Sequence, residues 1–255
     1  MKFGICILNS IPLRIEASDP SEMVSQVLFG EHFTILETKK QWFYIKLAYD
    51  GYRGWIDSKQ VEEISEEYFN DLQNSPLFIL NELVNYANTK EQLIPLSIGA
   101  IFPNYSNNKF SINDNSYAIE GDVKEVKLSK ELLVETAFMY LNAPYLWGGK
   151  TPFGIDCSGF TQMVYKINGF KLFRDASQQA KQGEVLSFIE ESEPGDLAFF
   201  DNNEGAITHV GIILNNNYII HASGKVRLDR LDQSGIYNEE TKRHTHKLRM
   251  MKRIF

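Results

Sequence analysis

Residues 143–160 read APYLWGGKTPFGIDCSGF, and TQMVYKING follows at 161–169. Apolar residues then recur at helical spacing, at Phe160, Met163, Val164 and Ile167. This pattern predicts a helix that begins at Cys157. A thiol at a helix start lies near the positive end of the helix dipole and near unpaired N–H groups, which favour the thiolate and can receive an oxyanion. Cys157 is therefore the candidate nucleophile.

A cysteine nucleophile needs a base, and His209 and His221 are the internal candidates in this half of the chain. They lie in strand-like segments, ITHVGIIL at 207–214 and YIIHASG at 218–224, with a turn of three asparagines between them. Neighbouring strands of a hairpin can hold two such side chains side by side. We therefore predict that His209 takes the thiol proton and that His221 orients its ring.

Four motifs in this half resemble the NlpC-type (NlpC/P60) family of bacterial cell-wall cysteine peptidases. They are D-C-S-G-F, P-G-D-L-A-F-F, T-H-V-G-I-I-L and I-I-H-A-S-G, and the match covers residues 128–255. The resemblance implies a papain-like α+β core and a triad of Cys157, His209 and His221. It also implies hydrolysis of the bond between γ-D-glutamate and the following L-diamino acid of a murein stem peptide.

The resemblance extends to a subgroup with amino-terminal barrels that requires a free L-alanine, which makes L-Ala-γ-D-Glu-diamino acid the expected partner. An arginine suits the α-carboxylate of D-glutamate, and carboxylates suit the alanine ammonium. Ala176 departs from the pattern, because many relatives have a serine after the Arg-Asp pair. The matching pocket residues are Tyr145, Trp147, Asp156, Ser158, Arg174 and Asp175, with Glu22 and Tyr52 expected from the first barrel and Glu31 and Tyr49 as their alternatives.

The chain before residue 128 is predicted to be all β. Short apolar stretches alternate with turn residues, and Asp50-Gly51 is a strong hairpin signal. The segments at 42–44 (WFY) and 54–56 (GWI) resemble a bacterial SH3-like barrel. We predict two small SH3-like barrels, at 1–66 and 67–127, before an α+β catalytic domain at 128–255.

Local patterns predict further elements. Ser129 is the predicted N-cap of a helix over 130–141, and residues 77–87 have helical potential. The acidic run EEISEE at 62–67 is interpreted as a solvated stretch between the barrels. Cys6 is interpreted as a buried hydrophobic residue, and His32, His244 and His246 as ordinary polar residues.

The 255 residues carry a formal charge of -7, which disfavours a broad electrostatic grip on nucleic acid or anionic lipid. No apolar run is long enough to span a bilayer. The chain as given is expected to be cytoplasmic, or periplasmic or secreted if a leader was removed. No metal or organic cofactor is expected, because a thiolate supplies the nucleophile.

Two alternatives stay open at this point. The same core could serve a peptidoglycan amidase or an acyltransferase, which product analysis would distinguish. The chain could also be a non-catalytic wall-binding protein, in which the barrels grip murein and the catalytic domain is vestigial. The intact Cys-His-His set favours an enzyme.

Overall fold

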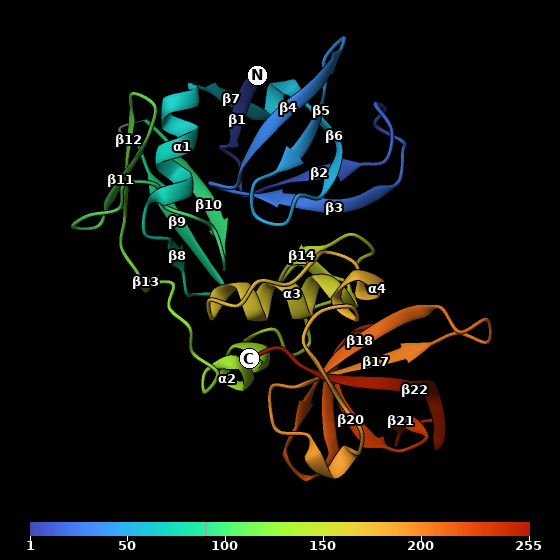
Figure 1. The fold of residues 1–255 in the computed structure, drawn as a ribbon. Coiled ribbons are helices and arrows are strands. Elements are labelled where there is room, and N and C mark those ends of the chain that lie inside the picture. Colours follow the sequence, from blue (N-terminus) through green and yellow to red (C-terminus); the bar gives the residue numbers. More distant parts are fainter. Residues whose placement is uncertain (90) are drawn as a thin grey trace. The chain divides into compact units, whose positions relative to one another are not determined.

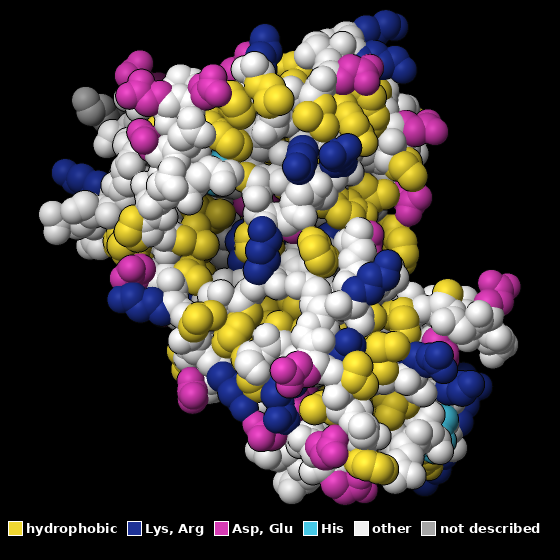
Figure 2. All heavy atoms as spheres, in the orientation of Figure 1, with side chains coloured by type: hydrophobic (Ala, Val, Ile, Leu, Met, Phe, Trp, Pro, Cys, Tyr) yellow, Lys and Arg dark blue, Asp and Glu magenta, His cyan; other side chains and the backbone are white. Residues whose placement is uncertain are grey.

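The computed structural model describes residues 1–89 and 91–255, which form two compact units, 1–126 and 127–255 (Figure 1). On the face drawn in Figure 2, basic and acidic side chains are interspersed over each unit. Within these described ranges, the helices are all too short or too polar to cross a membrane.

The amino-terminal unit begins with a seven-stranded antiparallel sheet in the order β3-β2-β6-β5-β4-β1-β7, which wraps around one apolar core. The hairpin predicted at Asp50-Gly51 is confirmed, because β5 and β6 pair there and Gly51 takes a φ of 75°. Cys6 is fully buried in this core. The elements are β1 (Lys2–Cys6), β2 (Ser10–Arg14), β3 (Met23–Leu28), β4 (His32–Lys39), β5 (Trp42–Leu47), β6 (Arg53–Asp57), η1 (Ser58–Gln60) and β7 (Val61–Ile64).

The rest of this unit packs on the same strands. Its core joins Phe3 of β1 and Phe29, which follows β3, to Phe110 and Tyr117. The rings of Phe110 and Tyr117 stack with their centroids 4.8 Å apart. Gly30 permits the close approach of the chain at Ile101, since an added Cβ at residue 30 would lie 2.1 Å from the Ile101 carbonyl oxygen. The elements are α1 (Glu66–Asn74), β8 (Phe78–Leu80), β9 (Val84–Asn88), β10 (Leu93–Ser97), β11 (Lys109–Ile112), β12 (Asn115–Ile119) and β13 (Val123–Glu125).

Two local predictions in this unit are wrong. Residues 77–87 form strands β8 and β9, because the apolar side chains there pack in a sheet, and the helix α1 lies earlier, capped by the Ser65 hydroxyl. The acidic run 62–67 is largely exposed, as predicted, but it is not a linker. It belongs to β7 and to the first turn of α1, where glutamates favour the positive end of the helix dipole.

The carboxy-terminal unit contains a closed barrel. Its strands follow the ring β22-β17-β18-β19-β20-β21, and the pairing of β21 with β22 closes the ring. The predicted hairpin of His209 and His221 is confirmed as β18 and β19, joined by three asparagines. The strands are β14 (Lys150–Thr151), β15 (Gly154–Ile155), β16 (Glu184–Leu186), β17 (Leu197–Asp201), β18 (Ile207–Leu214), β19 (Tyr218–Ser223), β20 (Lys225–Asp232), β21 (Gly235–Asn238) and β22 (Arg243–Arg253).

Short helices lie beside this barrel, and α3 (Cys157–Ile167) packs against β18 (Figure 1). The predicted cap at Ser129 is wrong, because its N–H donates to the Asn168 carbonyl and the α2 helix begins only at Leu133. The remaining helices are α2 (Leu133–Met139), α4 (Ala176–Gln179), η2 (Ile189–Glu191) and η3 (Asn215–Asn217).

Candidate active site

Asp156 fixes the start of α3, the helix whose first residue is the candidate nucleophile. Its Oδ1 atom accepts the Gly159 N–H at 2.7 Å, and its Oδ2 atom accepts the Gly148 N–H at 2.8 Å. Only glycine fits at 159, since an added Cβ would lie 2.3 Å from the Gly149 carbonyl oxygen. The glycines and the aspartate therefore tie the preceding loop to the helix start that presents Cys157.

A buried ion pair lies beside this helix start. The two terminal nitrogens of Arg174 donate to the two carboxylate oxygens of Asp156 at 2.9 and 2.6 Å. The Ser158 hydroxyl oxygen also accepts from Arg174, at 2.9 Å. Arg174 and Asp156 are 1% and 5% exposed, so each charge needs the other. The sequence predicted that Arg174 binds the α-carboxylate of the substrate and that the aspartates bind its ammonium. In the structure, Arg174 and Asp156 instead bind each other.

Cys157 lies where α3 meets β18. It is 6% exposed, and its Sγ atom is 4.0 Å from the Thr208 carbonyl oxygen, one residue before His209. Burial, and then the Asp156 carboxylate, raise the pKa of the Cys157 thiol to about 12. Nearby backbone N–H groups and Arg174 lower it, but burial outweighs them. The helix start favours the thiolate as predicted, but burial has the larger effect, so the thiol needs a base to remove its proton.

A line of hydrogen bonds crosses three neighbouring strands beside this thiol. The Nε2 atom of His209 lies 2.9 Å from Nδ1 of His221, and Nε2 of His221 lies 3.0 Å from Oδ2 of Asp229. Arg227 donates to both oxygens of Asp229, at 2.7 and 3.0 Å. Burial raises the pKa of Asp229, but hydrogen bonds from His221 and Arg227 outweigh burial and lower it below its ordinary value.

The ionised carboxylate decides where the protons of both rings lie. Asp229 can only accept, so Nε2 of His221 carries a proton and its Nδ1 is an acceptor. Nε2 of His209 must then donate to that acceptor, which leaves Nδ1 of His209 unprotonated. Burial, and then His221, lower the pKa of His209 well below 6.5, so the ring is neutral near pH 7. This tautomer can accept a proton from a thiol.

Gly211 allows the second histidine to take its place. It faces His221 directly across the β18–β19 ladder, and an added Cβ at 211 would lie 2.8 Å from the His221 Cβ. The glycine in T-H-V-G-I-I-L is therefore required by the cross-strand approach of His221.

Comparisons with known proteins identify the domains that carry this geometry. Residues 142–249 match the NlpC/P60 family, and residues 13–61 match the bacterial dipeptidyl-peptidase SH3 domain. The chain carries an NlpC/P60 domain after a bacterial SH3 domain. The predicted recognition is thereby confirmed, and so is the fold class of SH3-like barrels preceding a papain-like core.

Relatives that match most of the chain agree with these domains. A γ-D-glutamyl-L-lysine dipeptidyl-peptidase of Bacillus subtilis is 29% identical, with 78% of this chain and 71% of the relative covered. Dipeptidyl-peptidase 6 of Lysinibacillus sphaericus is 27% identical, with 93% and 95% covered. An NlpC/P60 family protein from Bacillus cereus shares the fold, with a TM-score of 0.83, 19% identity and 99% of each chain covered. Both of these curated relatives are named as peptidases, which agrees with the NlpC/P60 domain of this chain.

His246 is a neighbour of the NlpC/P60 site that the sequence did not reveal. Its ring stacks on His209, with centroids 4.2 Å apart and planes inclined by 24°. Burial, and then His221, lower the pKa of His246 to about 4, so it is neutral beside the neutral His209. Although three histidines and Asp229 lie near one another, no group of His, Cys, Asp or Glu in 1–89 and 91–255 has the arrangement of a metal site.

These histidines predict acid sensitivity of the NlpC/P60 unit. His209 and His246 have folded pKa values below 6.5, so the unfolded chain binds more protons as the pH falls below about 6.5. Their contribution to stability is present above that pH and is lost below it. We expect the melting temperature to fall from pH 7 to pH 5, and His246→Phe to reduce that fall while preserving the stack. Calorimetry at pH 8, 7, 6 and 5 measures the melting temperatures. An equal fall with pH in the unaltered protein and in His246→Phe would contradict the contribution assigned to His246.

The other predicted pocket residues surround the start of α3 at different depths. Tyr145 is 36% exposed, and burial, followed by Cys157 and Asp156, raises its pKa to about 12, so it is a neutral phenol close to the thiol. Trp147 is 60% exposed in the same loop. Asp175 is the N-cap of α4, and Ala176 brings no hydroxyl to the first position of that helix.

The predicted barrel residues lie in the amino-terminal unit. Glu22 is exposed just before β3, and Tyr52 is half-buried against the barrel core after the Asp50-Gly51 turn. Of the alternatives, Glu31 is buried and its carboxylate accepts the Leu28 N–H at 2.8 Å, which indicates a structural task. Tyr49 is half-buried in the β5–β6 turn. The pocket roles of Glu22 and Tyr52 stay predictions.

Proposed function

We propose that this chain is a cysteine peptidase that cuts the bond between γ-D-glutamate and the L-diamino acid of murein peptides. The observation that carries the proposal is the bonded line from His209 through His221 to Asp229, beside a thiol at a helix start. Cys157 is the nucleophile, His209 the base, and His221 the group that holds the base in its reactive tautomer.

The reaction begins with proton transfer from the Cys157 thiol to Nδ1 of His209. The sulfur then forms a bond to the γ-glutamyl carbonyl carbon, and the carbonyl electron pair moves to oxygen. N–H groups at the start of α3 and the Tyr145 phenol are candidates to stabilise that oxyanion. Because Tyr145 stays protonated, it can donate a hydrogen bond there.

Collapse of this intermediate breaks the amide C–N bond. His209 returns its proton to the departing amine, and an acyl-enzyme thioester remains. Water, deprotonated by His209, attacks the thioester and releases the γ-glutamyl product with the thiol restored. The imidazolium formed in each half-reaction is stabilised through His221 by the Asp229 carboxylate, which Arg227 keeps ionised.

Support for the substrate comes from the named activity of the Bacillus subtilis relative, a γ-D-glutamyl-L-lysine dipeptidyl-peptidase. Removal of a dipeptide requires recognition of the free amino end. Both oxygens of Asp156 are engaged by Arg174 and by N–H groups, so within the catalytic unit we assign the L-alanine ammonium to Asp175. A contribution of Glu22 and Tyr52 to recognition of the ammonium rests on the family resemblance, and substitution tests it. The Asp156–Arg174 pair then holds the helix start and the Ser158 hydroxyl in place.

The free amine is tested with two peptides that differ only at their amino end. L-Ala-γ-D-Glu-L-Lys should be cut to L-Ala-γ-D-Glu, whereas its N-acetylated form should be cut at least about 100-fold more slowly, because the ammonium loses charge-assisted hydrogen bonds. Mass spectrometry of the products gives kcat/KM and also distinguishes a peptidase from an amidase or acyltransferase.

Two variants make the same test specific. Glu22→Gln should reduce the preference for the free amine. Glu37→Gln, a change of the same kind at an exposed position of β4, should not. Equal rates on the two peptides would eliminate the proposed selectivity without affecting the assignment of Cys157.

A further inference from the structure

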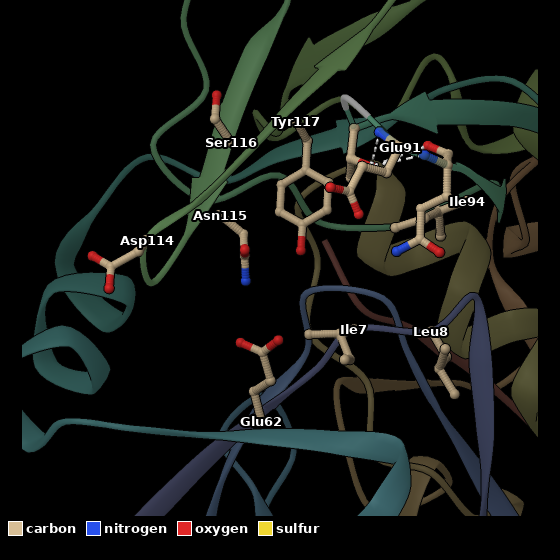
Figure 3. Close-up of a pocket in the computed structure, with 11 residues that line it drawn as sticks. Ile7, Leu8, Glu62, Glu91, Ile94, Asp114, Asn115, Ser116 and Tyr117 are labelled. Carbon is tan, nitrogen blue, oxygen red and sulfur yellow. Dashed lines mark hydrogen bonds between the residues drawn. The ribbon is translucent and has the colours of Figure 1, made fainter.

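The amino-terminal unit contains a cavity of about 510 Å³ that the reaction above does not use. It lies between β7, β12 and the strands and turns around them (Figure 3). Its volume falls within the range usual for small-ligand sites. Apolar side chains form part of its wall, and three carboxylates give it a negative charge. The apolar members are Ile7, Leu8 and Ile94, and the carboxylates are Glu62, Glu91 and Asp114.

Three oxygen-bearing side chains converge in this cavity. Figure 3 shows the Glu62 carboxylate on one side and the Asn115 amide and Tyr117 hydroxyl on the other, pointing toward the same open space. Asn115 and Tyr117 are two residues apart on β12, so the strand presents both on one face. One oxygen of Glu62 accepts Asn113 Nδ2 at 3.0 Å, which holds the carboxylate in position.

Tyr117 is the member of this set that points to a ligand. Its side chain is 5% exposed and its ring stacks on Phe110, yet the described part of the chain, 1–89 and 91–255, gives its hydroxyl no hydrogen-bond partner. Burial, and then Glu62, raise the pKa of Tyr117, so the group is a neutral phenol. The ring is buried while the hydroxyl reaches the open space of the cavity, so this oxygen is available to a bound molecule or to water.

We propose that this cavity binds a primary ammonium at the end of an aliphatic chain, as in a lysine or diamino acid side chain. An ammonium has three N–H donors, and Glu62, Asn115 and Tyr117 offer three oxygens for them. The chain methylenes would lie against Ile7 and Ile94. Anions are disfavoured, because the carboxylates that line the cavity would repel them.

The test uses the full chain labelled with ¹⁵N and two small probes. Nα-acetyl-L-lysine methylamide carries the side-chain ammonium, and Nα-acetyl-L-norleucine methylamide replaces it with a methyl group. Neither has a free α-amine, so neither meets the requirement proposed for the active site. The lysine probe should shift the backbone amide signals of Asn115 and Tyr117 saturably. The norleucine probe should bind at least about tenfold more weakly, because it lacks the charged donors.

Matched variants locate the binding. Glu62→Gln should weaken the lysine probe by a similar factor, and Tyr117→Phe should weaken it while preserving the stack on Phe110. Glu63→Gln is the control, since Glu63 is the next residue on β7 but bonds to Lys2 at 3.1 Å and does not line the cavity. Equal binding of both probes, absence of saturable shifts, or an unchanged affinity in Glu62→Gln would overturn the proposal.

A final titration identifies the source of the ammonium. L-Ala-γ-D-Glu-L-Lys is added to the Cys157→Ala variant, which cannot form the thioester, and the signals of Asn115 and Tyr117 are followed. Tighter binding than that of the lysine probe would indicate a murein peptide, and equal binding would indicate any lysine side chain. Because these signals come from the amino-terminal unit, the result is independent of whether murein peptides are cut.

Discussion

Cys157→Ala should abolish cleavage of L-Ala-γ-D-Glu-L-Lys, with kcat reduced by roughly 10⁴-fold or more. The sulfur is the atom that forms the thioester, and a methyl group cannot take its place. Product formation followed by mass spectrometry over hours measures the residual rate. Since the thiol is buried and uncharged at rest, its replacement by a methyl group should leave the fold intact.

Cys6→Ala is the matched control, because Cys6 is the other cysteine of the chain and is fully buried in the first barrel. It should retain the rate of the unaltered protein. A thiol-alkylating reagent should likewise inactivate the Cys6→Ala protein and label it once, at residue 157. Full activity in Cys157→Ala would overturn the assignment of the nucleophile.

Arg174→Met should destabilise the catalytic unit by about 3–5 kcal/mol, the usual cost of removing one partner from a buried ion pair. The change leaves the Asp156 carboxylate buried without its counter-charge, and it removes the hydrogen bond to the Ser158 hydroxyl. Hydrogen exchange of peptides from α3, read against urea concentration, measures the loss. Activity should fall as well, since Asp156 fixes the helix start that carries Cys157.

Arg230→Met provides the comparison for this result. Arg230 pairs with Glu239 at 3.1 Å in the same unit, but both side chains are at least half exposed, so solvent screens the pair and little stability should be lost. If Arg174→Met were no more damaging than Arg230→Met, the buried pair would not hold the helix start.

The sequence predicted the candidate nucleophile and the two histidines because each lies in a motif with a clear local period. Cys157 precedes a run with helical spacing, and three asparagines between two apolar strands specify the hairpin of His209 and His221. Strands can be predicted locally, because apolar residues with strand-forming side chains occur in short runs bounded by turn residues.

Asp229 and His246 depended on contacts that the local pattern does not encode. Asp229 reaches His221 from β20, where His221 faces Arg227, so the register of that hairpin is the signal that could have found it. His246 contacts His209 from β22, a strand that comes much later in the sequence than β18 and pairs with β17 and β21. A helix was predicted at 77–87, where strands β8 and β9 form, for a similar reason. In a short apolar run, tertiary packing decides between helix and strand.

Because the barrel is closed, we expect activity to be lost on heating only when the barrel itself unfolds. His209, His221, Asp229 and His246 come from β18, β19, β20 and β22, all members of one ring without a free edge. A one-residue slip of any of these strands would turn its side chain to the opposite face, and the ring permits no slip unless two ladders break together. Thermal inactivation and barrel melting should therefore coincide in one sharp transition, with no partly active, loosened form between them.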